Sequence, residues 1–226
     1  MYTYKNLNII GTSHIAIQSI KEVEQVILDI KPNIVALELD PKRFQSLIHK
    51  KKTKLRLRDI EKVGFKGFLF NALGAWIENK LGKSVGILPG SEMKKAVETA
   101  YKVKADLALI DQDIEITLKK LSQTLTWKEK FRFLIDILKS LFATKKNNIN
   151  IDLTKVPDEK MISILTNQVK KRYPSFYKVL IKDRNFFMAK ALYNLMNKDT
   201  SKTIVAVVGA GHEKDLISII KLHDTV

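Results

Sequence analysis

The chain contains four short apolar runs with strand character, and a polar residue follows the end of each. The runs cover residues 7–10, 34–39, 105–110 and 204–208, with helical patterns between them. Strands that alternate with helices predict right-handed crossovers and a parallel sheet. We therefore predict an α/β fold in which a mostly parallel central sheet is flanked by helices.

Helical patterns account for most of the remaining residues. The segment from about 114 to 198 separates the third run from the fourth, and we predict that it is a helical insertion over the carboxyl edge of the strands. Ser91 is expected to cap the helix that follows the Pro89-Gly90 turn. A chain of 226 residues that is 45% apolar suits one core, so one domain over residues 1–226 is expected. Helices are expected at 19–30, 42–51, 57–81, 91–102, 114–125, 127–142, 158–172, 175–197 and after 213.

The expected helix at 127–142 carries an apolar stripe. An apolar stripe of this kind is more typical of a core or of a dimer interface than of a membrane-seeking face. The stripe consists of Trp127, Phe131, Leu134, Leu138 and Leu141.

Polar side chains at the strand ends form a second pattern. In an open parallel sheet the carboxyl ends of the strands lie side by side, so groups far apart in sequence can face one crevice. A His after a Gly turn, or an acid after a strand, often only caps the next helix. Four such strand ends together nevertheless indicate an enzyme site. They are Gly11-x-x-His14, Glu38 with Asp40, Asp111 with Asp113, and Gly209-x-x-His212.

Composition excludes several classes of site. The chain has no cysteine, so a disulfide framework, a thiolate metal site and a cysteine nucleophile are excluded. The formal net charge of +16 suggests the hypothesis that the chain binds nucleic acid. The lysines, however, are spread along the chain, and only residues 49–54 form a dense basic block. We expect that block to be a solvated surface, with neither nucleic acid nor anionic lipid as its partner. No run approaches the length needed to span a bilayer and no secretory leader is evident, so a cytoplasmic location is expected, with membrane association only if the natural chain is longer.

Four segments of the chain carry a distinctive set of residues. They are Gly11-Thr12-Ser13-His14, Val35-Ala36-Leu37-Glu38-Leu39-Asp40 with Arg43, Pro89-Gly90-Ser91-Glu92-Met93 and Val207-Val208-Gly209-Ala210-Gly211-His212. In this order, and over nearly the whole chain, these segments resemble the TraB family, which includes bacterial pheromone-shutdown proteins, archaeal homologues and the Tiki metalloproteases of animals.

The resemblance implies an α/β fold related to erythromycin-esterase-like and ChaN-like proteins, and a divalent-metal-dependent peptidase activity. In the resemblance His14 and His212 match the two motif histidines of the family, and Glu38 matches its motif glutamate. Arg43, Glu92 and the segment 183–185 fall where the family carries polar residues. One position departs from the family, because Gln112 stands where an Arg is usual, and any charge pairing made by that Arg is absent here.

Two imidazoles and a carboxylate are a suitable ligand set for Mn²⁺, Co²⁺ or Zn²⁺. Asp113 or Glu92 could accept a proton, and Arg43 or Arg184 could stabilise an oxyanion. The expected substrate is a peptide or protein, and a homodimer is compatible with the apolar stripe. Two alternatives stay open, namely a metal-free esterase-like hydrolase that uses His and Glu38, and a non-catalytic regulatory protein that binds peptides.

Overall fold

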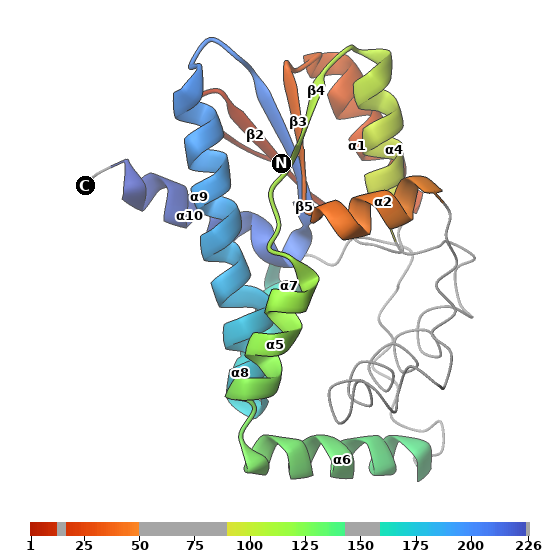
Figure 1. The fold of residues 1–226 in the computed structure, drawn as a ribbon, viewed down its shortest axis with the longest axis vertical. Helices are drawn as coiled ribbons and strands as arrows, with labels where there is room; N and C mark the ends of the chain where they lie inside the picture. The colour runs from red at the N-terminus through yellow and green to blue at the C-terminus, as the bar shows by residue number, and fades with distance from the viewer. Residues whose placement is uncertain (13–16, 50–89, 143–158, 225–226) are drawn as a thin grey trace.

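The computed structural model describes residues 1–12, 17–49, 90–142 and 159–224. Their strands form one five-stranded sheet in the order β1-β2-β5-β3-β4 (Figure 1). β2, β5, β3 and β4 are parallel, and only β1 runs antiparallel, against β2. The predicted fold class is therefore confirmed. The strands are β1 (Tyr2–Tyr4), β2 (Leu7–Thr12), β3 (Ile34–Leu37), β4 (Asp106–Leu109) and β5 (Ile204–Gly209).

The central strand β5 is buried along its whole length. Its alternate side chains enter two separate cores, as the pleat of a strand requires. Ala206 and Val208 belong to the core beneath α9 (Asp183–Lys198) and α10 (Ala210–His223). Val205 and Val207 belong to the core beneath α1 (Ile17–Ile30) and α4 (Ser91–Lys102). Burial on both faces explains why this strand is a continuous apolar run rather than an alternating one.

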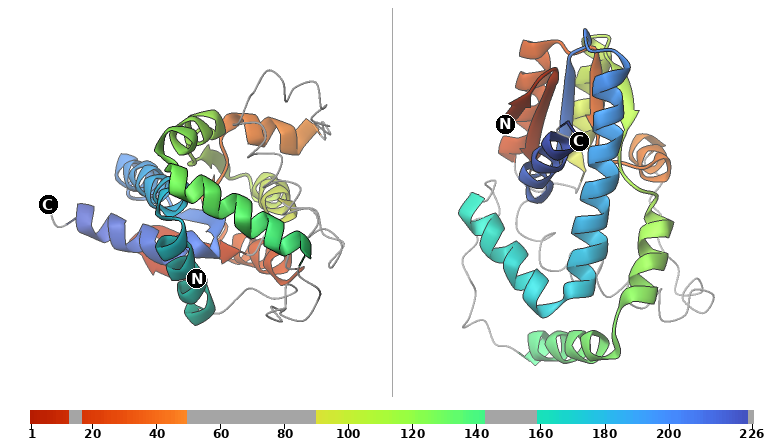
Figure 2. Two further views of the ribbon diagram at one scale, coloured as in Figure 1. Left: turned by 90° about the horizontal axis from the view of Figure 1, so that it is seen from below. Right: turned by 90° about the vertical axis from the view of Figure 1, so that its left-hand side faces the viewer.

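Further helices extend beyond the carboxyl edge of the sheet. α2 (Pro41–His49) follows β3, and α5 (Ile114–Thr124) follows β4. Figures 1 and 2 show α6 (Trp127–Phe142) across the far end of this helical layer. α7 (Glu159–Arg172) and α8 (Pro174–Tyr177) lead back towards α9. Among the described residues, no helix is long and apolar enough to cross a membrane.

The structure corrects three details of the sequence prediction. Ser91 is not the cap of α4, because Gly90 holds that position with φ 87°, a left-handed conformation that glycine tolerates. The predicted helix at 175–197 is interrupted by a π-helical segment at Lys178–Lys182. Strand β1 was not predicted, since three residues are too few to show a periodicity.

The α6 stripe is also not part of the core. Trp127 is 74% exposed, Phe131 62% and Leu134 44%. The side chains of Leu138 and Leu141 lie outside the described residues, as do His14, the expected helix at 57–81 and most of the lysine block. A dimer interface at the stripe stays a prediction.

Candidate active site at the carboxyl edge of the sheet

Glu38 is a buried carboxylate at the carboxyl end of β3. Its backbone N–H still bonds Val207 O of the neighbouring strand at 3.1 Å, so the strand geometry fixes its position. Its Oε2 accepts a hydrogen bond of 2.7 Å from the N–H of Gly209, the residue that caps α10. A helix N-terminus favours a negative charge. The pairing of β3 with β5 therefore places this carboxylate at an electropositive helix end.

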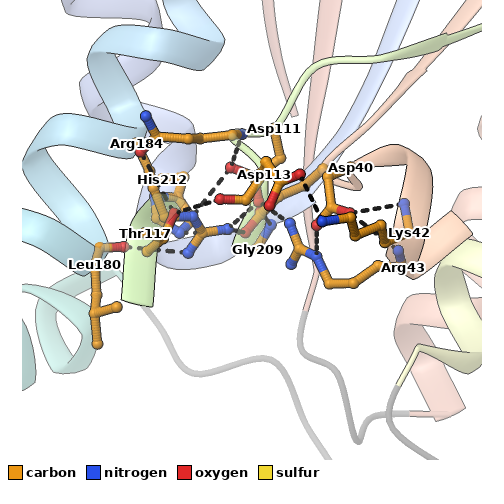
Figure 3. Close-up of polar contacts among 12 residues, drawn as sticks. Asp40, Lys42, Arg43, Asp111, Asp113, Thr117, Leu180, Arg184, Gly209 and His212 are labelled. Carbon is orange, nitrogen blue, oxygen red and sulfur yellow. Dashed lines mark hydrogen bonds and ion pairs between the residues drawn. The ribbon is translucent and has the colours of Figure 1, made fainter. Parts of the chain in front are cut away.

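Arg184 links Glu38 to a second buried carboxylate, that of Asp111. Figure 3 shows Arg184 beside Asp111. Its Nη2 contacts Glu38 Oε1, while Nε and Nη2 donate to the two oxygens of Asp111 at 3.1 and 2.5 Å. Nη1 donates to the carbonyl of Leu180 at 3.1 Å, inside the π-helical segment. π-helical turns are frequent at functional sites. Here the turn immediately precedes the helix that carries the arginine.

Arg43 extends the same ion-pair network towards α2. It contacts Asp111 through Nη2 and donates through Nε to Asp40 at 2.5 Å. Asp40 also caps α2, because its Oδ1 accepts the backbone N–H groups of Lys42 and Arg43 at 2.9 and 3.0 Å. Asp40 and Asp111 are both buried, so these ion pairs are shielded from solvent. The network thus joins the ends of β3 and β4 to α2 and α9.

His212 approaches Glu38 from the first turn of α10. Its Nε2 lies 3.4 Å from Glu38 Oε1, and its Nδ1 lies 2.5 Å from Asn185 Oδ1. The amide nitrogen of Asn185 donates to Asp215 at 2.9 Å. A carboxylate can only accept, so Asp215 orients the amide with its oxygen towards the imidazole, and Nδ1 must then carry the proton. Asp215 and Asn185 therefore fix a tautomer of His212 whose Nε2 points to Glu38.

Charges in the site keep both carboxylates ionised. Burial raises the pKa of Glu38, but the charge of His212 in its protonated form, the charge of Arg184 and the Gly209 N–H outweigh burial, so its pKa lies below the usual value. Burial also raises the pKa of Asp111, and Arg184 and Arg43 again reverse the effect. The pKa of Arg184 is raised, because its two carboxylate partners overcome the cost of burial. The site is thus charged at neutral pH.

The structure brings together four of the predicted site residues, namely Glu38, Arg43, Arg184 and His212. His14, the other predicted metal ligand, lies outside the described residues. Asp113 caps α5 through a 2.7 Å bond from Glu115 N–H and pairs with Lys42 at 3.3 Å. Glu92 is buried in the first turn of α4.

The structure adds Asp111, Asn185 and Asp215 to the residues for which the sequence predicts a role in the site. Asp111 belongs to the strand ends that indicate an enzyme site, and it follows β4 much as Glu38 follows β3. Asn185 lies beside Arg184 on α9, in the segment 183–185 that the resemblance marks as polar. Asp215 lies one turn after His212 on α10 and carries no such mark, since its contact with Asn185 joins helices 30 positions apart in sequence.

The spacing of His212 and Glu38 is compatible with the spacing of two ligands on one divalent metal ion. Around a tetrahedral ion with bonds of about 2.0–2.1 Å, neighbouring ligand atoms lie about 3.4 Å apart. The observed separation of His212 Nε2 and Glu38 Oε1 is 3.4 Å. A carboxylate has about four lone-pair sites, so the Arg184 and Gly209 contacts leave Glu38 able to bind an ion. Among the described residues there is no cluster of three His, Asp or Glu side chains arranged for a metal.

Several known proteins are similar in sequence to most of this chain. An uncharacterized protein of Methanocaldococcus jannaschii is 40% identical over 96% of this chain and 53% of its own length. The TraB domain-containing proteins of Homo sapiens and Mus musculus are each 22% identical over 90% of this chain and 60% of their own length. The chain therefore spans roughly half to three-fifths of these relatives. The TraB/PrgY/gumN family matches residues 3–222, and the chain belongs to this family.

Proposed function

We propose that the chain is a divalent-metal-dependent hydrolase that acts on peptides. The observation that carries the proposal is the approach of His212 Nε2 to Glu38 Oε1, at a buried and charged sheet edge. His212 and Glu38 would hold the ion, with His14 as the third ligand. A bound Mn²⁺, Co²⁺ or Zn²⁺ would polarise a peptide carbonyl and would lower the pKa of a bound water towards neutrality.

The residues around the ligands would have separate roles. Glu38 has a lowered pKa, which suits a ligand better than a proton acceptor. Arg184 uses all three guanidinium nitrogens on protein acceptors, so its role is to hold Glu38 and Asp111 in place. The side chain of Arg43 is 33% exposed and uses Nε and Nη2 in its described contacts, which makes it the better donor to a developing oxyanion.

The choice of proton acceptor lies between the two predicted carboxylates, Asp113 and Glu92. The bond from Glu115 N–H lowers the pKa of Asp113, with Lys42 adding to the effect, so Asp113 is a weak base. Glu92 is therefore the proposed acceptor. This assignment rests on its burial in α4 and on the position of the α4 N-terminus at the same sheet edge (Figure 1).

A metal-free hydrolase is the second candidate, because the contacts from Asp215 through Asn185 to His212 are also those of an oriented general base. With Nδ1 protonated, the Nε2 lone pair of His212 could accept a proton from water directly. Such an enzyme would keep its activity in the presence of a chelator. A non-catalytic protein that binds peptides would show no turnover with any metal.

Elemental analysis of protein purified without a histidine tag tests the metal site. We expect about one equivalent of divalent metal in the wild type after incubation with Mn²⁺, Co²⁺ or Zn²⁺. His14→Ala and His212→Ala should both lose it. His49→Ala, which changes an exposed histidine at the end of α2, should retain it. Peptide cleavage without bound metal, unchanged by chelation, would replace this proposal with the metal-free hydrolase.

A further inference from the structure

The exposed face of α6 combines an apolar stripe with a cationic border. Trp127, Phe131, Leu134 and Ile135 are 74%, 62%, 44% and 48% exposed. These side chains share one face of a helix with 3.6 residues per turn. Lys128 and Lys130 border the stripe on its two sides, with the ammonium of Lys130 4.6 Å from the centre of the Trp127 ring.

The two acidic residues in the described part of α6 point away from this face. Glu129 is buried and accepts hydrogen bonds of 2.8 and 2.6 Å from the N–H and hydroxyl of Ser175. Asp136 accepts from Arg172 Nε at 2.7 Å and also contacts Tyr173. The outward face of α6 is therefore apolar and basic, without a carboxylate among the described residues.

The neighbouring helices add positive charge at the same end of the molecule. Residues 114–142 and 159–182 hold twelve Lys and Arg against four Asp and Glu. Arg172 binds α6 through Asp136, so the exposed Lys170 and Lys171 at the end of α7 lie near α6. Figures 1 and 2 show α6 across the far end of the molecule, where no described element covers its outer side.

We propose that α6 docks this protein on an anionic lipid bilayer, with the helix lying in the plane of the interface. Trp, Phe and Leu on one face, with Lys bordering it, are the features of helices that insert into the headgroup region. A second copy fits less well, because a shared stripe would bring Lys128 and Lys130 of both copies together without carboxylates to pair them. A nucleic acid would match the charge but would leave the apolar stripe unexplained. The carboxyl edge of the sheet faces the α6 end, so docking would turn the Glu38 site towards the membrane (Figure 1).

Sedimentation of the full chain with phosphatidylcholine vesicles, with and without phosphatidylserine, tests the proposal. Binding is expected only with phosphatidylserine, weakening as salt rises. Trp127→Gln with Phe131→Gln should reduce binding more than tenfold, and Lys128→Gln roughly fivefold. Tyr101→Gln and Lys190→Gln are matched controls on α4 and α9, with exposed side chains, and should bind like the wild type.

Tryptophan fluorescence supplies a second measurement, which does not depend on how much vesicle binding the substitutions remove. In a Trp76→Phe background Trp127 is the only tryptophan, and its emission should shift to the blue and be quenched by brominated lipid. Absence of vesicle binding, or binding unaffected by the Trp127 and Phe131 changes, would overturn the proposal. Self-association in lipid-free sedimentation, abolished by the same changes, would assign the stripe to a second copy instead.

Discussion

At the scale of single residues, Asn185 has the most specific role in the site. Its carbonyl accepts the Nδ1 proton of His212, and its amide nitrogen is held by Asp215. Removing a group that orients an active-site histidine in this way lowers activity by about 10- to 100-fold. Asn185 is therefore a positioning residue rather than a catalytic one.

Asn185→Ala is expected to lower peptide turnover by about 10- to 100-fold while the protein stays folded. Histidine ¹⁵N chemical shifts should show the Nδ1–H tautomer of His212 in the wild type and a mixture in the variant. Asn194→Ala, an exposed change on the same helix, is the control. A variant with full turnover and an unchanged tautomer would show that the orientation of His212 does not depend on Asn185.

Gly11 has a steric role at the end of β2. An added Cβ would lie 2.3 Å from Glu213 Oε2 and 3.1 Å from the backbone Cα of Ala210. Gly11→Ala should therefore cost about 1–3 kcal/mol, since the packed α10 start cannot easily move. Gly211→Ala places its Cβ in open space within α10 and should be neutral or slightly stabilising. Denaturant unfolding of both variants measures the difference, and equal stabilities would contradict the close approach of Glu213 to β2.

At the scale of elements, Glu129 fastens the start of α6 to α8. It forms a capping box with Thr126 and accepts both the N–H and the hydroxyl of Ser175. Burial raises the pKa of Glu129, but the Ser175 and Thr126 bonds outweigh burial and lower it. This joint positions the basic and apolar face of α6.

Glu129→Ala should destabilise the fold by about 2–3 kcal/mol, because it leaves the buried N–H of Ser175 without its charged acceptor, while the Ser175 hydroxyl can still donate to the Thr124 carbonyl. Glu115→Ala is the matched control, since Glu115 also lies in the first turn of a helix but its side chain is 72% exposed. Its effect should stay within about 0.5 kcal/mol. Unfolding curves that show similar losses of stability for both variants would argue against a stabilising contact between Glu129 and Ser175.

Most helix boundaries could be predicted from the sequence, whereas β1 and the π-helical segment could not. The helices from α4 to α7 were predicted to within about two residues because their apolar positions recur at helical spacing. β1 is an edge strand defined by pairing with β2, and the π-helical segment is defined by contacts around Leu180 and Arg184. Both depend on tertiary partners, which periodicity cannot reveal.

At the scale of the whole molecule, the part of the site that strand ends define is the part that the sequence predicts most directly. Glu38 and His212 follow parallel neighbouring strands, so their meeting follows from topology. Arg184 is predicted only as one of two candidates to stabilise an oxyanion, and the structure places it against Glu38 with its side chain 15% exposed. The contacts of Asn185 with Asp215 and His212 could not be predicted, because the packing of α9 on α10 is not encoded in either segment alone.

The buried ion pairs predict how stability depends on pH. Glu38 and Asp111 have folded pKa values below their unfolded values of about 4.3 and 3.9. Their contribution is complete above the unfolded values and is lost as pH falls through the folded ones. Glu38→Gln should therefore be less stable than the wild type at pH 7, and the gap should narrow below about pH 4. Urea midpoints from pH 7 to about pH 3 measure this, and a constant gap would contradict the charged state of Glu38.

Peptide cleavage by wild type and Glu38→Gln is the most direct measurement of the proposed hydrolase. Each protein is incubated with a peptide library and added Mn²⁺, Co²⁺ or Zn²⁺, with His49→Ala as a folded control and thermal melting to follow folding. We predict that the wild type and His49→Ala cleave, and that Glu38→Gln loses about 100-fold or more in turnover while still melting cooperatively. Equal cleavage by wild type and Glu38→Gln, or no cleavage by the wild type with any metal, would contradict the assignment of this sheet edge as a hydrolytic site.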